Sequence, residues 1–190
     1  MRIGLLGGSF DPPHNGHLLA AGDVYDALAL DRVVFIPTAV QPLKASHADT
    51  TPAQRLTMVE CLIEGDSRFD VSAIEIERGG LSYTVDTLTT LAADWPSSEL
   101  FWLVGADVPP SFHRWRDPER IVELATVVVM ERGGETPDLS AIRGRVRSVA
   151  TRRVDVSSTE IRRRVREGKS VRGFVPDAVA RFIASERLYR

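Results

Sequence analysis

The sequence predicts an α/β protein with a single doubly wound, mainly parallel sheet and helices on both faces of that sheet. Short apolar runs alternate with amphipathic helical patterns along the chain. The apolar runs are continuous rather than interrupted by polar residues, as is typical of strands that are buried on both faces. Because 190 residues suffice for one domain and are few for two, we expect residues 1–190 to form a single domain.

The first strand is expected over residues 3–6 and ends at Gly7-Gly8. A helix is expected over residues 16–29, because apolar side chains recur there at helical spacing. These side chains are Leu18, Ala21, Tyr25 and Leu28. Residues 33–36 form the second apolar run, which Pro37 closes.

Thr51 begins the next predicted helix, with Pro52 at its first position and Gln54 completing a capping box. We assign the apolar stripe of this helix to Leu56, Val59, Leu62 and Ile63. Residues 69–76 are strand-like. The next amphipathic helix has an apolar face made of Val85, Leu88, Leu91 and Trp95.

Strong apolar runs predict strands over residues 100–104 and 126–130, and between them Asp117-Pro118 starts a helix that carries Ile121 and Leu124. Residues 131–139 favour a loop, and a less regular run that could form a strand follows as far as Val156. Ser157 and Glu160 form a second capping box for a helix that stops at Gly168. Pro176 opens the last helix, whose inward residues are Val179, Phe182 and Ile183.

Charge and cysteine content exclude several classes of function. There are 24 Lys and Arg residues against 26 Asp and Glu residues, so the chain lacks the positive field of proteins that wrap duplex nucleic acid or lie on anionic membranes. We therefore expect neither kind of partner. Cys61 is the only cysteine, which argues against an internal disulfide framework and a thiolate zinc site. The first apolar run is too short for a signal peptide, so a soluble, cytoplasmic protein is expected.

Ligands of doubly wound sheets bind beyond the carboxyl ends of the strands, which here selects the segments after Leu6, after Val104 and after Val156. In the first segment, Gly7 and Gly8 let a ligand approach the backbone, but their spacing fits neither the dinucleotide fingerprint nor the P-loop.

Two histidines follow in the same segment. His14 and His17 are three residues apart, so on a helical turn both imidazoles would face one phosphate chain. The alternative is a tight turn whose histidines cap the chain locally.

The second segment contains Gly105, Asp107 and Trp115. Asp107 stands where a carboxylate could accept ribose hydroxyls, or it could simply begin a helix. Because Pro109-Pro110 argues against a long regular helix, we expect a loop from which Trp115 could stack on a flat ring, with core packing as the alternative.

The third segment places the hydroxyls of Ser157, Ser158 and Thr159 at a helix N-terminus, and Arg162 follows one turn later. Such an arrangement can hold an anion, because N–H groups, hydroxyls and a guanidinium fork converge there. The alternative is an ordinary capping box followed by a solvated basic helix.

The run Gly-Ser-Phe-Asp-Pro-Pro-His-Asn-Gly-His at residues 8–17, together with Ser-Ser-Thr-Glu-Ile-Arg at residues 157–162, resembles the nucleotidylyltransferase superfamily with the HxGH signature. Within it the chain resembles the bacterial nicotinate-nucleotide adenylyltransferases. The supporting residues are Ser-Tyr-Thr-Val-Asp-Thr-Leu at 82–88, Gly105-Ala106-Asp107 with Trp115, and Phe174-Val175-Pro176. The resemblance covers nearly the whole chain and is weak over residues 133–156.

This resemblance implies a Rossmann-like fold and transfer of AMP from ATP to nicotinate mononucleotide, which yields nicotinate adenine dinucleotide and pyrophosphate. It implies catalytic roles for His14, His17 and Arg162. The ATP-binding residues that it implies are Gly7, Gly8, Ser9, Phe10, His14, His17, Gly105, Asp107, Ser157, Ser158, Thr159 and Arg162. The residues that it implies for nicotinate mononucleotide are Lys44, Tyr83, Thr84 and Trp115, with Trp115 stacking on the pyridine. Mg²⁺ is implied as an ion held mainly by the ATP phosphates, without a dedicated protein site.

One position departs from the family pattern. The family often has Pro-Pro-His-Lys after the second strand, whereas this chain has Gln41-Pro42-Leu43-Lys44, so the lysine is kept and the histidine is not. Three alternatives stay open: adenylyl transfer to nicotinamide mononucleotide, adenylyl transfer to phosphopantetheine, and a non-catalytic nucleotide-binding regulatory module. A homo-oligomer also stays open.

Overall fold

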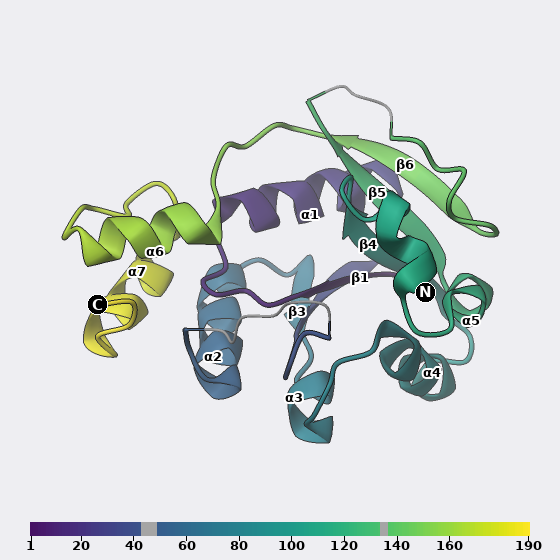
Figure 1. Ribbon diagram of the computed structural model, residues 1–190, viewed down its shortest axis with the longest axis horizontal. Helices are drawn as coiled ribbons and strands as arrows, with labels where there is room; N and C mark the ends of the chain where they lie inside the picture. The colour runs from purple at the N-terminus through teal and green to yellow at the C-terminus, as the bar shows by residue number, and fades with distance from the viewer. Residues whose placement is uncertain (43–48, 134–136) are drawn as a thin grey trace.

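The computed structural model describes residues 1–42, 49–133 and 137–190 (Figure 1). Its strands are β1 (Arg2–Gly8), β2 (Arg32–Pro37), β3 (Phe69–Val71), β4 (Glu99–Gly105), β5 (Thr126–Arg132) and β6 (Val146–Thr151). Its helices are α1 (Asn15–Ala27), α2 (Pro52–Ile63), α3 (Ile74–Arg78), α4 (Thr84–Asp94), the 3₁₀ helix η1 (Pro109–Arg114), α5 (Pro118–Leu124), α6 (Ser158–Arg166) and α7 (Asp177–Ser185).

The six strands form one sheet in the order β3-β2-β1-β4-β5-β6, and every neighbouring pair in it is parallel. Leu5 in the central strand β1 lies opposite Val34 on one side and Trp102 on the other. This strand order is that of doubly wound nucleotide-binding folds, whose direction of winding reverses between the first and fourth strands. The predicted fold class is therefore confirmed.

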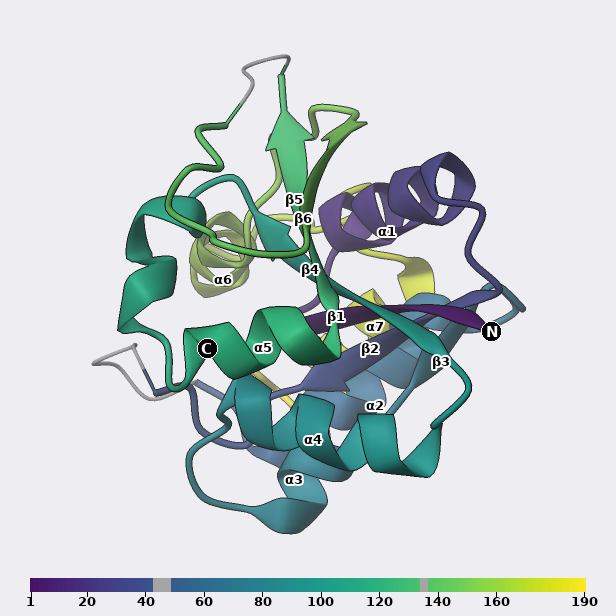
Figure 2. The ribbon, with the colours of Figure 1, turned by 90° about the vertical axis from the view of Figure 1, so that its right-hand side faces the viewer.

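Side chains of β1 alternate between two apolar layers. Leu6 belongs to the layer formed with α1, α2 and α7, whereas Ile3 and Leu5 belong to the layer formed with α4 and α5. Figure 2 shows α1 on one side of the strands and α4 and α5 on the other. The sheet is thus buried on both faces, which explains why its strands are continuous apolar runs.

The expected strand over residues 69–76 is wrong beyond Val71. Ser72 still donates its N–H to the carbonyl of Phe35, but its hydroxyl accepts the N–H of Ile74, and the chain turns into α3. A serine side chain that bonds to nearby backbone offers an alternative to the sheet ladder, and here that alternative prevails.

The predicted apolar stripe of α2 is confirmed at Val59 and Leu62, which are buried, and in part at Ile63, which packs against the core. The buried residues of α2 are Arg55, Met58, Val59 and Leu62, while Leu56 and Ile63 are only half-buried. The predicted capping box at its start is confirmed, because the Gln54 N–H reaches the Thr51 hydroxyl and the Thr51 N–H reaches the Gln54 side chain. The helix therefore begins where the sequence predicts, and its buried face includes Arg55 and Met58 in addition to the predicted Val59 and Leu62.

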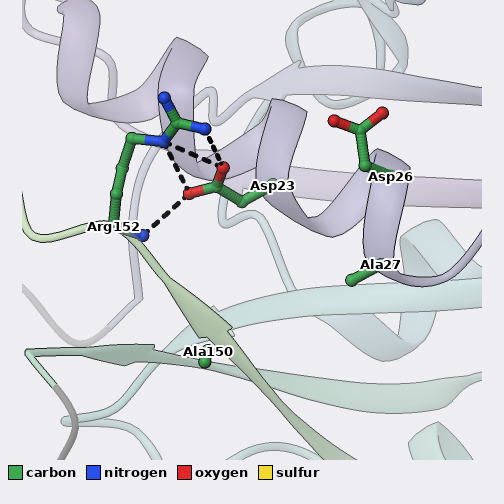
Figure 3. Close-up of a pocket in the computed structure, with 5 residues that line it drawn as sticks. All are labelled: Asp23, Asp26, Ala27, Ala150 and Arg152. Atoms are coloured by element: carbon green, nitrogen blue, oxygen red, sulfur yellow. Dashed lines mark hydrogen bonds and ion pairs between the residues drawn. The ribbon is translucent and has the colours of Figure 1, made fainter.

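A segment after β6 crosses over α1 to reach α6, as Figure 1 shows. Asp23 of α1 fixes this crossing, because its carboxylate accepts the Arg152 backbone N–H over 2.8 Å and the Arg152 Nη2 over 2.7 Å (Figure 3). The guanidinium holds the pKa of the Asp23 carboxyl below its usual range. Within the described residues, no helix has the length and apolar character needed to span a membrane.

Candidate active site

A cleft of about 750 Å³ lies at the carboxyl ends of β1, β2 and β4. All three segments that the sequence singled out contribute to its wall. The predicted site residues along the cleft are Gly7, Gly8, Ser9, Phe10, His17, Tyr83, Thr84, Gly105, Asp107, Trp115, Ser158, Thr159 and Arg162. His14 and Ser157 are not among the lining residues, and the predicted Lys44 lies outside the described residues, as does Leu43.

Gly7 and Gly8 leave space that aromatic rings fill. A Cβ at Gly7 would lie 2.9 Å from the indole of Trp102, and a Cβ at Gly8 would lie 3.0 Å from the ring of Phe10. Phe10 itself has a φ of 50°, in the left-handed region, and is 3% exposed. A side chain at either glycine would therefore have to displace an aromatic ring at the carboxyl end of β1, next to the space where a ligand would lie.

His14 and His17 stack, with ring centroids 3.7 Å apart, but only His17 lines the cleft. His14 precedes α1 and is 5% exposed, and its backbone N–H donates to Nδ1 of His17 over 3.2 Å. Because Nδ1 of His17 accepts this hydrogen bond, the proton of the neutral ring resides on Nε2. His17 is thereby fixed as a donor through Nε2, with His14 packed against it.

The loop between β1 and α1 is joined to the C-terminal part of the chain by direct hydrogen bonds. Nη1 of Arg162 donates to the carbonyl of Asp11 over 2.7 Å, and the Ser158 hydroxyl donates to the carbonyl of Pro12 over 2.8 Å. The side-chain amide of Asn15 donates to the carbonyl of Gly173 over 2.9 Å. The two sequence motifs that lie farthest apart along the chain thus form one wall of the cleft.

Asp11 is part of this wall and binds several of its neighbours. Its carboxylate, 6% exposed, accepts hydrogen bonds from the hydroxyls of Thr50 and Tyr189, each over 2.7 Å, and from the N–H of Asp49 over 2.8 Å. Burial, reinforced by the nearby Asp11 carboxylate, raises the pKa of Tyr189 far above its usual value. With both carboxylate oxygens engaged inside the protein, Asp11 acts as a structural centre of the loop.

Ser157 caps α6 and does not face the cleft. Its hydroxyl accepts the N–H of Glu160 over 3.2 Å, but the carboxylate of Glu160 pairs with Arg163 instead of returning to the backbone. Only half of the predicted capping box therefore forms. Ser158, Thr159 and Arg162, the next residues of the motif, do line the cleft.

Gly105 and Asp107 lie together at the end of β4. A Cβ at Gly105 would lie 2.5 Å from Oδ1 of Asp107, so only glycine lets this carboxylate fold back over the strand end. In place of the expected loop, residues 109–114 form the 3₁₀ helix η1, and Trp115 follows its last residue. Trp115 packs against Phe112 with ring centroids 5.3 Å apart, and its indole is half-buried along the cleft.

Tyr83, Thr84 and Trp115 line the same end of the cleft, and two arginines join them. Arg116 lies 4.8 Å from the centre of the Tyr83 ring, and its Nη1 lies 3.2 Å from Oδ2 of Asp86. Arg114 also lines the cleft. The N–H of Thr84 belongs to the first turn of α4 and has no acceptor within that helix. This end of the cleft therefore offers backbone and guanidinium donors next to an aromatic ring.

Arg55 is a lining residue that the sequence analysis missed. It is 1% exposed and donates to the carbonyls of Ser9, over 2.8 Å, and Ala39, over 3.0 Å. Burial lowers the pKa of its guanidinium. The signal was available, because Arg55 shares a helical face with Met58, Val59 and Leu62, and a buried arginine on an apolar face needs a polar partner.

Glu75 is a second missed residue, hidden by the wrong assignment of residues 69–76 to a strand. It is 2% exposed and lines the cleft, and its Oε1 accepts the Thr87 hydroxyl over 2.7 Å. Arg78 in turn donates to that hydroxyl over 2.9 Å. Burial raises the pKa of the Glu75 carboxyl. Glu75 thus ties α3 to the beginning of α4, beside Tyr83 and Thr84.

A second hollow is lined by Asp23, Asp26, Ala27, Ala150 and Arg152 (Figure 3). Asp23 and Arg152 already bind one another across it, so we assign it the structural role of fixing the crossing segment. Among residues 1–42, 49–133 and 137–190, no three His, Cys, Asp or Glu side chains are grouped so that they could hold a metal ion.

Comparison with known proteins places this chain beside a family and several relatives. The family model described as cytidylyltransferase-like matches residues 5–164. A protein from Gemmatimonas aurantiaca, named as a probable nicotinate-nucleotide adenylyltransferase, is 51% identical to this chain. The alignment covers 100% of this chain and 93% of that protein. A Thermus thermophilus protein with the same name is 44% identical over the full length of both chains.

A solved structure gives the same fold at lower sequence identity. Plasmodium falciparum nicotinic acid mononucleotide adenylyltransferase complexed with NaAD matches with a TM-score of 0.81 and 18% identity, covering 99% of this chain and 97% of that one. This likeness concerns the fold, with six parallel strands in the sheet described above.

Proposed function

Because this chain belongs to the cytidylyltransferase-like family and, within it, to the nicotinate-nucleotide adenylyltransferases, we propose that it transfers AMP from ATP to nicotinate mononucleotide. A phosphate oxygen of the mononucleotide attacks the α-phosphorus of ATP. The bond between that phosphorus and the oxygen bridging to the β-phosphate breaks. The products are nicotinate adenine dinucleotide and pyrophosphate, and the reaction belongs to NAD biosynthesis.

One observation supports this function above the others. The His17 imidazole and the Ser158–Arg162 stretch, from opposite parts of the chain, line one cleft and are joined through the backbone of Asp11 and Pro12. The attacking phosphate is already anionic at neutral pH, so the reaction needs no general base. It needs donors that bring two anions into line and neutralise the charge that develops on pyrophosphate.

We assign His17 the role of donor to the α-phosphate, because Nδ1 is occupied by the His14 N–H and Nε2 carries the proton. His14 acts through His17, whose ring it packs against. The backbone N–H of Ser158 and the side chains of Thr159 and Arg162 hold the β- and γ-phosphates at the beginning of α6, where the helix dipole adds to their effect; the Ser158 hydroxyl itself stays on the carbonyl of Pro12. The backbone of Gly7, Gly8, Ser9 and Phe10 follows the triphosphate, and Gly105 and Asp107 hold the adenosine ribose.

We propose that the pyridine ring stacks on Trp115 and lies next to Tyr83 and Thr84. The nicotinate carboxylate would accept a hydrogen bond from the N–H of Thr84. The positive charges of Arg114 and Arg116, which also line the cleft, would attract it. This local positive charge favours the acid over the neutral amide of nicotinamide mononucleotide. Lys44, predicted to contact the mononucleotide, keeps that role as a hypothesis.

ATP enters, in our proposal, as its Mg²⁺ complex. The Asp11 carboxylate accepts three protein hydrogen bonds, so oxygens of the ATP phosphates are the better ligands for this ion. When bound there, Mg²⁺ screens the β- and γ-phosphates and assists the departure of pyrophosphate.

Residues 1–190 act as one catalytic domain in this proposal, since α6 and the loop after β1 build the same wall. We place the enzyme in the cytoplasm, where ATP is available, and propose small nucleotides rather than nucleic acid as its partners. Its oligomeric state, including a homo-oligomer, does not enter the mechanism, because every residue assigned here comes from one chain.

A panel of pyrophosphate-release assays tests this function. MgATP is combined in turn with nicotinate mononucleotide, nicotinamide mononucleotide, phosphopantetheine and FMN. We expect the highest kcat/KM with nicotinate mononucleotide. A higher value with the amide or with phosphopantetheine would transfer the assignment to that acceptor, and ATP binding without pyrophosphate release from any acceptor would indicate a regulatory module.

A further inference from the structure

Asp49 contacts two arginines of α6 through a single carboxylate oxygen. Its Oδ2 lies 3.1 Å from Nε of Arg162 and 2.7 Å from Nη2 of Arg166. The two arginines are four residues apart on the helix and therefore share one face. Arg162 lines the cleft, whereas Asp49 and Arg166 do not, so the carboxylate holds Arg162 from outside the cleft.

These contacts determine which donors of Arg162 remain available. A guanidinium carries five N–H groups. Nε faces Asp49, Nη1 donates to the carbonyl of Asp11 over 2.7 Å, and Nη2 lies 3.5 Å from the hydroxyl of Thr159. One N–H on Nη1 and one on Nη2 are left, and they have no further acceptor among the described residues. Two such N–H groups, held in one plane, match two oxygens of a phosphate.

Asp49 is itself fixed in place. Its backbone N–H donates to Oδ2 of Asp11 over 2.8 Å, and Asp11 is a buried residue of the cleft wall. Asp11 therefore orients Arg162 in two ways, directly through its carbonyl and indirectly through the backbone of Asp49.

A carboxylate beside a phosphate-binding arginine has an electrostatic cost, because it offsets the positive charge that should attract ATP. Arg166 removes this disadvantage, since it contacts the same oxygen of Asp49. The three side chains together carry one net positive charge, the same as Arg162 alone. Orientation of Arg162 is thus gained without loss of local charge.

We propose that Asp49 is a positioning residue for Arg162 and that Arg166 is the cation that compensates its charge. This inference rests on the proposed function, because it treats Arg162 as the group that binds the triphosphate. Asp49 orients the guanidinium for the transition state, and Arg166 preserves the attraction for ATP.

Two substitutions separate these roles. Asp49→Asn keeps the backbone hydrogen bond to Asp11 and removes the charge that holds Nε. We expect kcat to fall about tenfold, as for a misplaced donor, with KM for ATP unchanged or lower. Arg166→Gln leaves Asp49 paired with Arg162 alone, and we expect KM for ATP to rise about threefold with kcat nearly unchanged.

Glu167→Gln is the matched control. It makes the same charge change as Asp49→Asn beside the same helix, but Glu167 pairs with Arg163 and Lys169. We expect wild-type kcat from it. Asp49→Asn should also lower kcat no further in an Arg162→Ala background, because its effect passes through Arg162. An undiminished loss in that background would overturn the proposal, as would an Asp49→Asn enzyme with wild-type kcat.

Calorimetric titration of the same proteins with MgATP distinguishes this inference from the proposed function. If the wild type turned over none of the four acceptors, the proposed function would be wrong. The dissociation constants for MgATP would still test whether Arg166 compensates the charge of Asp49 beside Arg162. A threefold weaker ATP affinity in Arg166→Gln but not in Glu167→Gln supports it. Equal affinities in the wild type, Arg166→Gln and Glu167→Gln would contradict it.

Discussion

The hydroxyl of Tyr189 donates to Oδ1 of Asp11 over 2.7 Å and so joins two residues 178 positions apart in the sequence. Both side chains are buried, at 5% and 6% exposed. Asp11 belongs to the loop that follows β1, and the same loop accepts the hydrogen bonds of Ser158 and Arg162. The hydrogen bond between Tyr189 and Asp11 therefore helps to hold the loop that forms the cleft wall.

Tyr189→Phe removes one donor from the buried Asp11 carboxylate. We expect the free energy of unfolding to fall by about 1–3 kcal/mol, as is typical for a hydrogen bond to a charged group. Urea denaturation measures this change. Tyr25→Phe is the control, because the Tyr25 ring packs at the edge of the core and its hydroxyl has no hydrogen bond within the described residues. Equal stability of the two variants would show that the contact contributes nothing.

His17→Ala should lower kcat by roughly 10²-fold or more, because it removes a preorganised donor at the α-phosphate. Steady-state pyrophosphate release gives kcat, and circular dichroism shows whether the fold is retained. His113→Ala, in the exposed part of η1, is the control and should behave as the wild type. If the His17→Ala enzyme retained kcat, His17 would have no part in the mechanism.

Arg162→Ala should impair turnover to a similar extent, and Arg162→Lys should restore only part of it. A lysine supplies the charge but not the planar pair of N–H groups, nor the bond to the Asp11 carbonyl at the same time. The comparison is made on kcat/KM for ATP. Full activity in the lysine variant would mean that a point charge suffices there.

Arg116→Gln should reduce the preference for the acid over the amide mononucleotide by about fivefold, the scale expected for one partly exposed charge pair. The measured quantity is the ratio of kcat/KM for the two acceptors. Arg120→Gln removes an arginine that pairs with Glu123 on α5, away from the cleft lining, and should leave the ratio unchanged. An unchanged ratio in Arg116→Gln would leave acid recognition to Arg114 and the backbone donors.

Asp23→Asn should lower Tm by about 2–4 °C at neutral pH, because it breaks the attachment of the crossing segment to α1. Arg152 lowers the pKa of Asp23 in the folded state, so the stabilisation is present above the unfolded-state pKa of about 3.9 and disappears as the pH falls through the lower folded value. Differential scanning calorimetry over pH 2–7 follows the difference between variant and wild type. Asp155→Asn, at a more exposed ion pair, should show little change at any pH.

The doubly wound fold and the three polar segments that line the cleft were predictable from the sequence, because they depend on local patterns. Continuous apolar runs mark strands that are buried on both faces, and the three polar segments stand at strand ends, which parallel strands bring together. The histidine pair followed from spacing alone, although the sequence could not show that only His17 lines the cleft. The orientation of the His17 ring depends on a hydrogen bond from the backbone N–H of His14.

The residues that the sequence analysis missed are held by long-range contacts. Arg55 bonds to the carbonyls of Ser9 and Ala39, which lie 46 and 16 positions away. Glu75 was hidden because residues 69–76 read as one strand, whereas the Ser72 hydroxyl diverts the chain into α3. Asp49 looks like an ordinary loop residue until α6 is placed beside it. Such partners become visible only after the chain has folded.

The hydrogen bonds between α6 and the loop after β1 connect segments that are synthesised at very different times. Translation produces the loop after β1 within the first 17 residues, but Ser158 and Arg162, which bond to that loop, emerge from the ribosome more than 140 residues later. The Tyr189 contact that secures the loop comes later still. A nascent chain therefore lacks one side of the cleft wall for most of its elongation, and the wall is complete only when α6 docks and Tyr189 reaches Asp11.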